Sequence, residues 1–128
     1  MKLRIDLSST VPVYRQIVDG LRILLVNGDL KPGDPLLPVR RMALDLGVHF
    51  NTVAEAYRTL AEEGWLEIGR RSGAQVVERT LPGKAGPETE AVFQRRLREL
   101  SAEVEARGLA RGRIARQLRA LAETLERS

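Results

Sequence analysis

Four residues that follow a tight glycine turn have side chains suited to recognising nucleic-acid bases: His49, Phe50, Asn51 and Thr52. In a DNA major groove, asparagine can form two hydrogen bonds with adenine, and threonine can bond to a base or touch the methyl group of thymine. The His49 ring can contact a phosphate or a base edge, and the Phe50 ring can touch a thymine methyl. The chemistry that this run offers is therefore non-covalent recognition of base edges.

Residue types that catalysis or metal binding would require are scarce. The 128 residues contain one histidine and no cysteine, which rules out disulfide bonds and argues against a structural zinc site. The sequence shows no nucleophile–base pair, no glycine-rich phosphate loop and no cluster of metal ligands. We therefore expect a protein that is not an enzyme and that uses no metal or cofactor.

The formal net charge of +4 favours nucleic acid only weakly as a partner. Residues 1–80 include 11 basic and 10 acidic residues, whereas residues 81–128 include 10 basic and 7 acidic residues. The N-terminal sequence lacks the apolar stretch of a signal peptide, and the longest strongly apolar run, Ile23–Val26, is too short to cross a bilayer. We expect a cytoplasmic protein without a membrane-spanning segment.

Helices that could position the base-facing candidates are indicated by the spacing of apolar residues. A first helix is predicted from Pro12 and is stopped near Gly28. A second, short helix would open at Pro38 and end at Gly47, and it would lead directly into a third helix that ends at Gly64. The four candidates would then occupy the start of the third helix.

Short strands flank these helices in the prediction. The alternation of apolar and polar residues predicts a half-buried strand over residues 3–7. Residues 65–68 and 75–78 are predicted to pair as a hairpin. Its tip contains Arg70 and Arg71, which would reach neighbouring phosphates or a minor groove.

Residues 81–87 have the composition of a linker, so we divide the chain into a domain over residues 1–80 and a tail over residues 88–128. Apolar spacing in the tail predicts two antiparallel helices, over about 88–106 and 111–127. Two helices alone make a thin core, so we favour burial against a second copy over an intramolecular hairpin. The residues assigned to this dimer interface are Phe93, Leu97, Leu100, Val104, Ile114, Leu118, Leu121 and Leu125.

Two short helices linked by a glycine turn and followed by a hairpin form a winged helix-turn-helix, whose second helix can enter a major groove. Residues 12–77 resemble the DNA-binding domain of the GntR family of bacterial regulators, and the short tail resembles that of its YtrA subfamily. The resemblance implies a mainly α fold with a small β wing, homodimerisation through a two-helix tail, and double-stranded DNA as the partner. It rests on the stretches PVYRQI (12–17), NGDLKPGD (27–34), VR (39–40), LGV (46–48), NTV (51–53), AYR (56–58) and EG (63–64).

The resemblance also implies roles for individual residues. Arg40 matches a family arginine that contacts DNA, Asn51 and Thr52 match the polar pair that starts the recognition helix, and Gly73 matches a wing glycine. The residues that we assign to DNA contact are Tyr14, Arg40, His49, Phe50, Asn51, Thr52, Arg58, Arg70, Arg71, Ser72 and Gly73.

The sequence departs from the family pattern at several of these positions. His49 stands where serine or threonine is usual, and Phe50 and Ala54 stand where arginine is frequent. In the wing, Arg71 falls where glycine is common and Ser72 where arginine is common. Fewer arginines neutralise fewer phosphates, which lowers affinity and flattens its dependence on salt.

Some assignments have a structural alternative. Asn51 and Thr52 are also good helix caps, Phe50 could pack against the second helix, and Tyr14 could be a partly buried ring rather than a phosphate donor. Arg40 could be a solvated charge. Pro38 replaces the capping serine that is usual in the family, which affects the start of the second helix and thereby the direction of the Arg40 side chain.

We expect a sequence-specific transcriptional regulator, a repressor, that binds a pseudo-palindromic operator as a homodimer. The alternative is a winged-helix protein-interaction module without sequence-specific DNA binding, which the near-neutral charge of residues 1–80 favours. A pocket between the domain and the tail could hold a small-molecule effector whose identity the sequence does not give.

Overall fold

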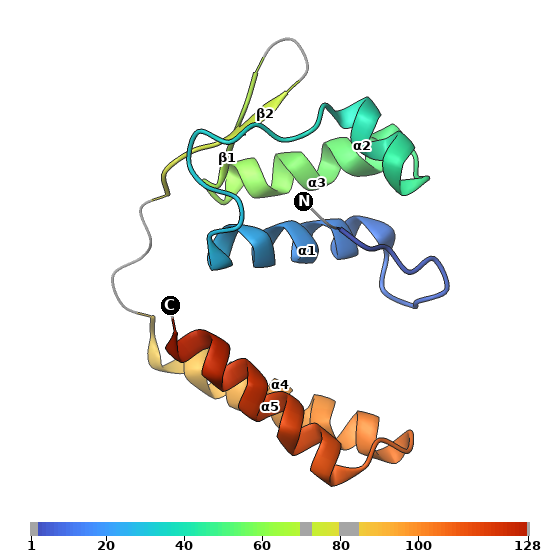
Figure 1. The fold of residues 1–128 in the computed structure, drawn as a ribbon, viewed down its shortest axis with the longest axis vertical. Helices are drawn as coiled ribbons and strands as arrows, with labels where there is room; N and C mark the ends of the chain where they lie inside the picture. Colours follow the sequence, from blue (N-terminus) through green and yellow to red (C-terminus); the bar gives the residue numbers. More distant parts are fainter. Residues whose placement is uncertain (1–2, 70–72, 80–84, 128) are drawn as a thin grey trace. The chain divides into compact units, whose positions relative to one another are not determined.

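The computed structural model describes residues 3–69, 73–79 and 85–127 (Figure 1). The chain divides into two compact units, residues 1–80 and 81–128, and each is described by itself. The described part is mainly helical, with five helices and one small antiparallel sheet. Among these residues, no helix is both long enough and apolar enough to span a membrane.

Helix α1 (Val13–Asn27) supplies one wall of the core of the first unit. Pro12 immediately precedes it, a position at which a missing backbone N–H costs little. Ile17, Leu21 and Leu25 are buried at helical spacing. The helix ends where Gly28 takes a left-handed conformation with φ of 83°, as its place in the sequence predicts.

Helices α2 (Val39–Leu46) and α3 (Phe50–Glu62) form the helix-turn-helix pair, and the turn at Gly47 has a φ of 72°. Helix α3 is central, because it contacts α1, α2 and the first strand (Figure 1). Val53, Ala56, Tyr57 and Leu60 are almost fully buried on its inner face. The opposite face and the leading end of α3 are left at the surface.

The wing is a hairpin of β1 (Leu66–Ile68) and β2 (Ala74–Val76). Leu66 pairs with Val76, and Ile68 pairs with Ala74. The second edge of β2 is also occupied, because the chain between α1 and α2 runs along it. There Leu36 donates its N–H to the Ala74 carbonyl at 2.8 Å, and Val76 donates to the Asp34 carbonyl at 2.9 Å.

The prediction of a strand over residues 3–7 is wrong. These residues take no strand conformation, and within the described ranges the only sheet is that of β1 and β2. Leu3 and Ile5 instead pack half-buried against the helical core, and Leu3 lies directly over Gly20 of α1. Leu7, the third apolar residue of the alternation, is 70% exposed, so the predicted buried face does not extend to this residue. The alternation therefore reflects two side chains, Leu3 and Ile5, that cover the core, although their segment pairs with no strand of the described residues.

The second unit consists of α4 (Pro87–Ala106) and α5 (Arg111–Glu126), which contact each other and are joined by a turn at Gly108, whose φ is 105°. The two predicted tail helices are confirmed to within one residue at each end. Neither helix contains a buried residue. Phe93, Leu100, Leu121 and Leu125 are each more than half exposed, so this unit leaves an apolar face uncovered.

Candidate nucleic-acid interface

The leading end of α3 is capped by the ring of His49. Its Nδ1 atom accepts a hydrogen bond from the backbone N–H of Asn51 at 3.0 Å, and its carbonyl accepts the N–H of Thr52 at 3.1 Å. A side chain that accepts from the second or third helical N–H is the usual arrangement of a helix N-cap. The other ring nitrogen, Nε2, takes no part in this cap.

The side chains of Asn51 and Thr52 are left available by this cap. Neither forms a hydrogen bond with the residues that the structure describes, and the Asn51 side chain is exposed. The alternative that these two residues serve only as the helix cap is therefore not what the geometry shows. Their polar groups lie on the first turn of α3, where side chains of a recognition helix reach base edges.

Phe50 packs against its neighbours and keeps part of its ring at the surface, so its contact with DNA stays a prediction. Its ring stacks on His49 with 4.7 Å between the ring centroids, and the guanidinium carbon of Arg40 lies 4.7 Å from the Phe50 centroid. The ring therefore packs against α2 through Arg40. It is nevertheless 38% exposed, so part of it remains at the surface.

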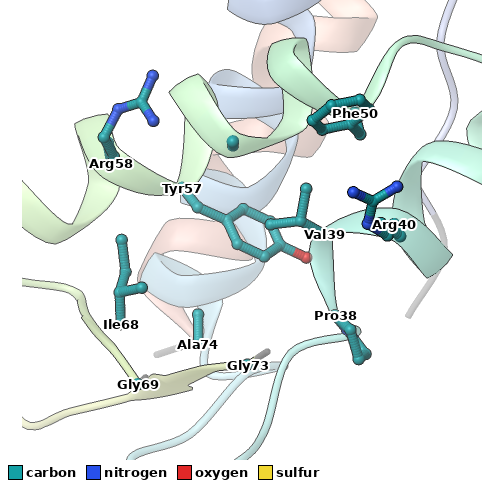
Figure 2. A pocket seen from close by; sticks show the side chains of 11 residues that line it. Pro38, Val39, Arg40, Phe50, Tyr57, Arg58, Ile68, Gly69, Gly73 and Ala74 are labelled. Carbon is teal, nitrogen blue, oxygen red and sulfur yellow. The ribbon is translucent and has the colours of Figure 1, made fainter. Parts of the chain in front are cut away.

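A hollow of about 560 Å³ lies between α2, α3 and the wing (Figure 2). Its walls are mainly apolar, and Arg40 and Arg58 lie on different sides of it (Figure 2). No acidic side chain lines it, and neither arginine forms an ion pair with any residue of the described ranges. The lining residues are Pro38, Val39, Arg40, Phe50, Ala54, Tyr57, Arg58, Ile68, Gly69, Gly73 and Ala74.

Tyr57 fixes the segment that leads into α2. Its hydroxyl donates to the carbonyl of Leu37 at 2.7 Å, and its ring is 1% exposed. Burial raises the pKa of the Tyr57 hydroxyl, so the donor proton is retained. Although Pro38 provides no side-chain cap, α2 begins at Val39, and Tyr57 ties this start to α3. Nothing in the sequence around Tyr57 indicates this hydrogen bond.

Tyr14 is engaged within the protein. Its hydroxyl lies 2.7 Å from the Thr59 hydroxyl, which itself donates to the carbonyl of Glu55 at 3.1 Å. The Tyr14 hydroxyl is therefore the donor in this contact, and it would have to give up Thr59 to donate to a phosphate. Its assignment to DNA contact stays a prediction, and such a contact would require loss of the hydrogen bond to Thr59.

The wing residues Arg70, Arg71 and Ser72 lie outside the described residues. Gly73 directly precedes β2 at the loop end of the hairpin, where its carbonyl accepts the N–H of Gly69 at 2.9 Å. A Cβ atom at Gly69 would lie 3.3 Å from that carbonyl oxygen, so the close approach of the two backbones favours glycine. The structure thus brings Arg40, His49, Phe50, Asn51 and Arg58 to one surface, with the loop end of the wing beside the hollow.

The far end of α3 is held by a separate ion-pair cluster. Arg22 of α1 donates to both carboxylate oxygens of Glu63, at 3.2 and 2.6 Å, and also contacts Asp19. The Glu63 carboxylate raises the pKa of the Arg22 guanidinium. This contact lies at the opposite end of the helix from Asn51, so it anchors α3 without occupying its leading end.

A helix-turn-helix with an exposed leading end, followed by a hairpin wing, defines a winged-helix DNA-binding domain. Residues 13–76 match the family described as bacterial regulatory proteins, gntR family. The chain therefore belongs to this family of bacterial regulatory proteins, and residues 13–76 form its winged-helix domain.

Two curated relatives illustrate the match. The chain is 38% identical over 76 residues to the HTH-type transcriptional repressor YtrA of Bacillus subtilis, covering 59% of this chain and 58% of that protein. It is 33% identical over 97 residues to the uncharacterised regulator YhcF of the same organism, covering 72% of this chain and 80% of that protein. The alignment with YtrA thus spans a little over half of that relative's length.

Solved structures extend the similarity to the tail. YtrA from Sulfolobus acidocaldarius is 28% identical, with a TM-score of 0.56, and the match covers 96% of this chain and 98% of that one. A GntR family transcriptional regulator from Listeria monocytogenes is 26% identical, with a TM-score of 0.55, and the match covers 88% and 97%. These proteins therefore share the whole layout of a winged helix followed by a short helical tail.

Proposed function

We propose that the chain is a sequence-specific repressor that binds a pseudo-palindromic operator as a homodimer. The observation that carries this proposal is the leading end of α3. There His49 satisfies the backbone, which leaves the side chains of Asn51 and Thr52 for base edges. A helix that enters the major groove with these residues in front can read sequence directly.

A phosphate contact is assigned to Arg58, whereas Arg40, on another side of the same hollow, is assigned to a base edge. If α3 lies in the major groove and the wing approaches the adjoining minor groove, the sugar-phosphate backbone between the two grooves passes over the hollow between α3 and the wing. Both arginines border that hollow, and neither is paired with a carboxylate among the described residues. Each phosphate contact would add counter-ion release to the binding free energy.

Homodimerisation is proposed to proceed through the tail. The exposed apolar residues of α4 and α5 have no cover within their own unit, and contiguous exposed apolar surface commonly marks an interface. A two-fold dimer would present two copies of α3 to a symmetric site. Repression is proposed because YtrA of Bacillus subtilis and MngR of Escherichia coli, both similar in sequence, are named repressors.

The test is selection of binding sites from random DNA by the purified full-length chain, followed by gel-shift titration of the selected site. We expect two inverted half-sites and an affinity at least about a thousandfold above that for unrelated DNA, the lower end of the range for specific regulators. The Asn51→Ala variant is expected to relax selection at one base pair in each half-site. Binding that ignores sequence would count against the proposal.

The second candidate, a protein-interaction module, is favoured by the near-neutral charge of residues 1–80 and by Ala54 where an arginine is frequent. The variants Arg40→Glu and Arg71→Glu separate the two functions. DNA binding collapses in both if the chain is a regulator, because repulsion replaces attraction toward phosphates. A partner-binding module would show the same DNA binding, weak and nonspecific, with and without these changes.

A further inference from the structure

We propose that Phe50 positions Arg40, and that the stacked pair reads a guanine in each half-site of the operator. This inference rests on the proposed function, because it assigns a base to one residue of the same interface. Phe50 acts through Arg40, so it is a positioning residue, whereas Arg40 is the residue that touches DNA. The ring stands where the family frequently has an arginine of its own, so one arginine on a platform would replace two.

The first observation is that Arg40 and Phe50 come from different helices and that the guanidinium lies over the ring. The guanidinium carbon of Arg40, on α2, lies 4.7 Å from the ring centroid of Phe50, on α3. The ring is in turn stacked on His49, with 24° between the two planes. Figure 2 shows Arg40 reaching across from α2 toward Phe50 at the start of α3. Phe50 is therefore held by its neighbours and can act as a fixed platform.

The second observation is that the guanidinium N–H groups of Arg40 form no side-chain hydrogen bond with the described residues, although its carbon lies over the ring. A guanidinium carries five N–H donors in one plane, and these remain for an acceptor outside the protein. Arg40 also has no carboxylate partner among the described residues, whereas its neighbour Arg41 pairs with Asp45 at 3.2 Å. Of these two adjacent arginines, only Arg40 is thus both restrained and available as a donor fork.

A restrained, planar fork suits one base acceptor pair better than the others. The O6 and N7 atoms of guanine accept two parallel N–H groups from arginine, which is the most frequent specific contact in the major groove. Adenine presents a donor beside its N7 and would leave one arginine N–H without an acceptor. Prior restraint by the ring also lowers the conformational entropy that the long side chain loses on binding.

The experiment uses the full-length chain and the operator obtained by selection. Each guanine of one half-site is replaced in turn by 7-deazaguanine, which lacks the N7 acceptor, and each phosphate in turn by an uncharged methylphosphonate. Affinities are measured for the unsubstituted chain and for Arg40→Ala, Phe50→Leu, Phe50→Tyr and the double variant Arg40→Ala/Phe50→Leu. The matched control is Arg41→Ala, and circular dichroism and thermal melting check that each variant is folded.

We expect one guanine whose 7-deaza replacement weakens binding of the unsubstituted chain by about tenfold, the range of one bidentate base contact. The same replacement should cost Arg40→Ala nothing further, and it should still cost Arg41→Ala the full amount. Phe50→Leu is expected to lose about two- to fivefold in affinity when Arg40 is present, and nothing in the Arg40→Ala background. Phe50→Tyr should restore affinity, because it keeps the ring face.

Three results would overturn the proposal while leaving sequence-specific binding intact. They are the absence of any guanine whose N7 depends on Arg40, an Arg40 dependence confined to a methylphosphonate position, and an equal loss from Phe50→Leu with and without the Arg40 side chain. Failure of the selection to yield any preferred sequence is a different result, which overturns the proposed function itself.

Discussion

The ring of His49 and the backbone N–H of Asn51, 3.0 Å apart, form the hydrogen bond that starts helix α3. A histidine thus does the work that a serine or threonine side chain does at many helix starts. The exchange has a consequence for the surface, because the capping side chain is an aromatic ring that also stacks on Phe50. Helix capping and the placement of Phe50 are therefore coupled through one residue.

Replacement of His49 tests this coupling. The His49→Ala variant should lose about 1 kcal/mol of unfolding free energy, the usual effect of removing an N-cap side chain. The His49→Ser variant should recover most of that loss, because a hydroxyl can accept the same N–H. Urea denaturation followed by circular dichroism measures both values. Equal destabilisation by alanine and serine would show that stacking on Phe50, rather than capping, is what His49 contributes.

Removal of the Tyr57 hydroxyl tests the link between α3 and the start of α2. The Tyr57→Phe variant leaves the Leu37 carbonyl without its donor, and we expect a loss of about 1–3 kcal/mol in unfolding free energy at neutral pH. Tyr14→Phe is the matched control, because its partner Thr59 keeps a second hydrogen bond to Glu55. A loss for Tyr57→Phe no larger than that for Tyr14→Phe would contradict the role given to this bond.

The same variant carries a pH dependence of known sign. Burial raises the pKa of Tyr57 above its ordinary value of 10.0, so the folded state holds this proton more tightly than the unfolded state. The contribution is fully present below the unfolded pKa and is lost as the pH rises toward the folded one. The stability difference between the unsubstituted chain and Tyr57→Phe should therefore be constant at neutral pH and shrink above about pH 10. A difference that grows above that pH would refute the assignment.

The phosphate role of Arg58 predicts a change in salt dependence. In Arg58→Ala the slope of the logarithm of the DNA association constant against the logarithm of salt concentration should fall by about 1, with the preferred sequence unchanged. Arg15→Ala is the control, because Arg15 is paired with Asp19 of its own helix at 3.4 Å. Gel-shift titrations across a salt series measure the slope. An unaltered slope with a changed base preference would place Arg58 at a base instead.

The tail predicts the oligomeric state. The Leu121→Glu variant places a charge among exposed apolar side chains, and we expect sedimentation to shift from dimer to monomer, with weaker binding to a two-half-site operator. Leu100→Glu tests the same face from α4, and Arg119→Glu is the control for adding a glutamate to α5. Helical circular dichroism confirms that the tail is folded. A dimer that persists in both leucine variants would mean that the interface lies elsewhere.

The order of the helices could be predicted from the sequence because their signals are local. Helical spacing of apolar residues and the left-handed glycines at 28 and 47 depend on neighbouring residues alone. The segment over residues 3–7 misled because alternation reports only which side chains face the core. Whether a segment becomes a strand depends on a hydrogen-bonding partner, and that partner is set by the tertiary fold.

The candidate site was predicted less completely, for a related physical reason. The position of Asn51 on the first turn of a helix follows from the turn before it. The Asn51 side chain is available for base contact only because His49 caps the helix. Histidine is a less common N-cap residue, so the sequence does not indicate this role. The stacking of Arg40 on Phe50 and the bond from Tyr57 to Leu37 join residues that are 10 and 20 positions apart, and neither spacing is a local signal.

The chain between α1 and α2 pairs with β2 through the backbone of Asp34 and Leu36, and α2 begins only three residues after Leu36. The strand that carries one side of the wing and the residue that opens the helix-turn-helix are thus fastened to the same short stretch. In the proposed complex with DNA, this shared attachment would fix the distance between the major-groove contacts of α3 and the minor-groove contacts of the wing. A half-site lengthened by a single inserted base pair would therefore be rejected, whereas the gap between the two half-sites is not governed by this tether.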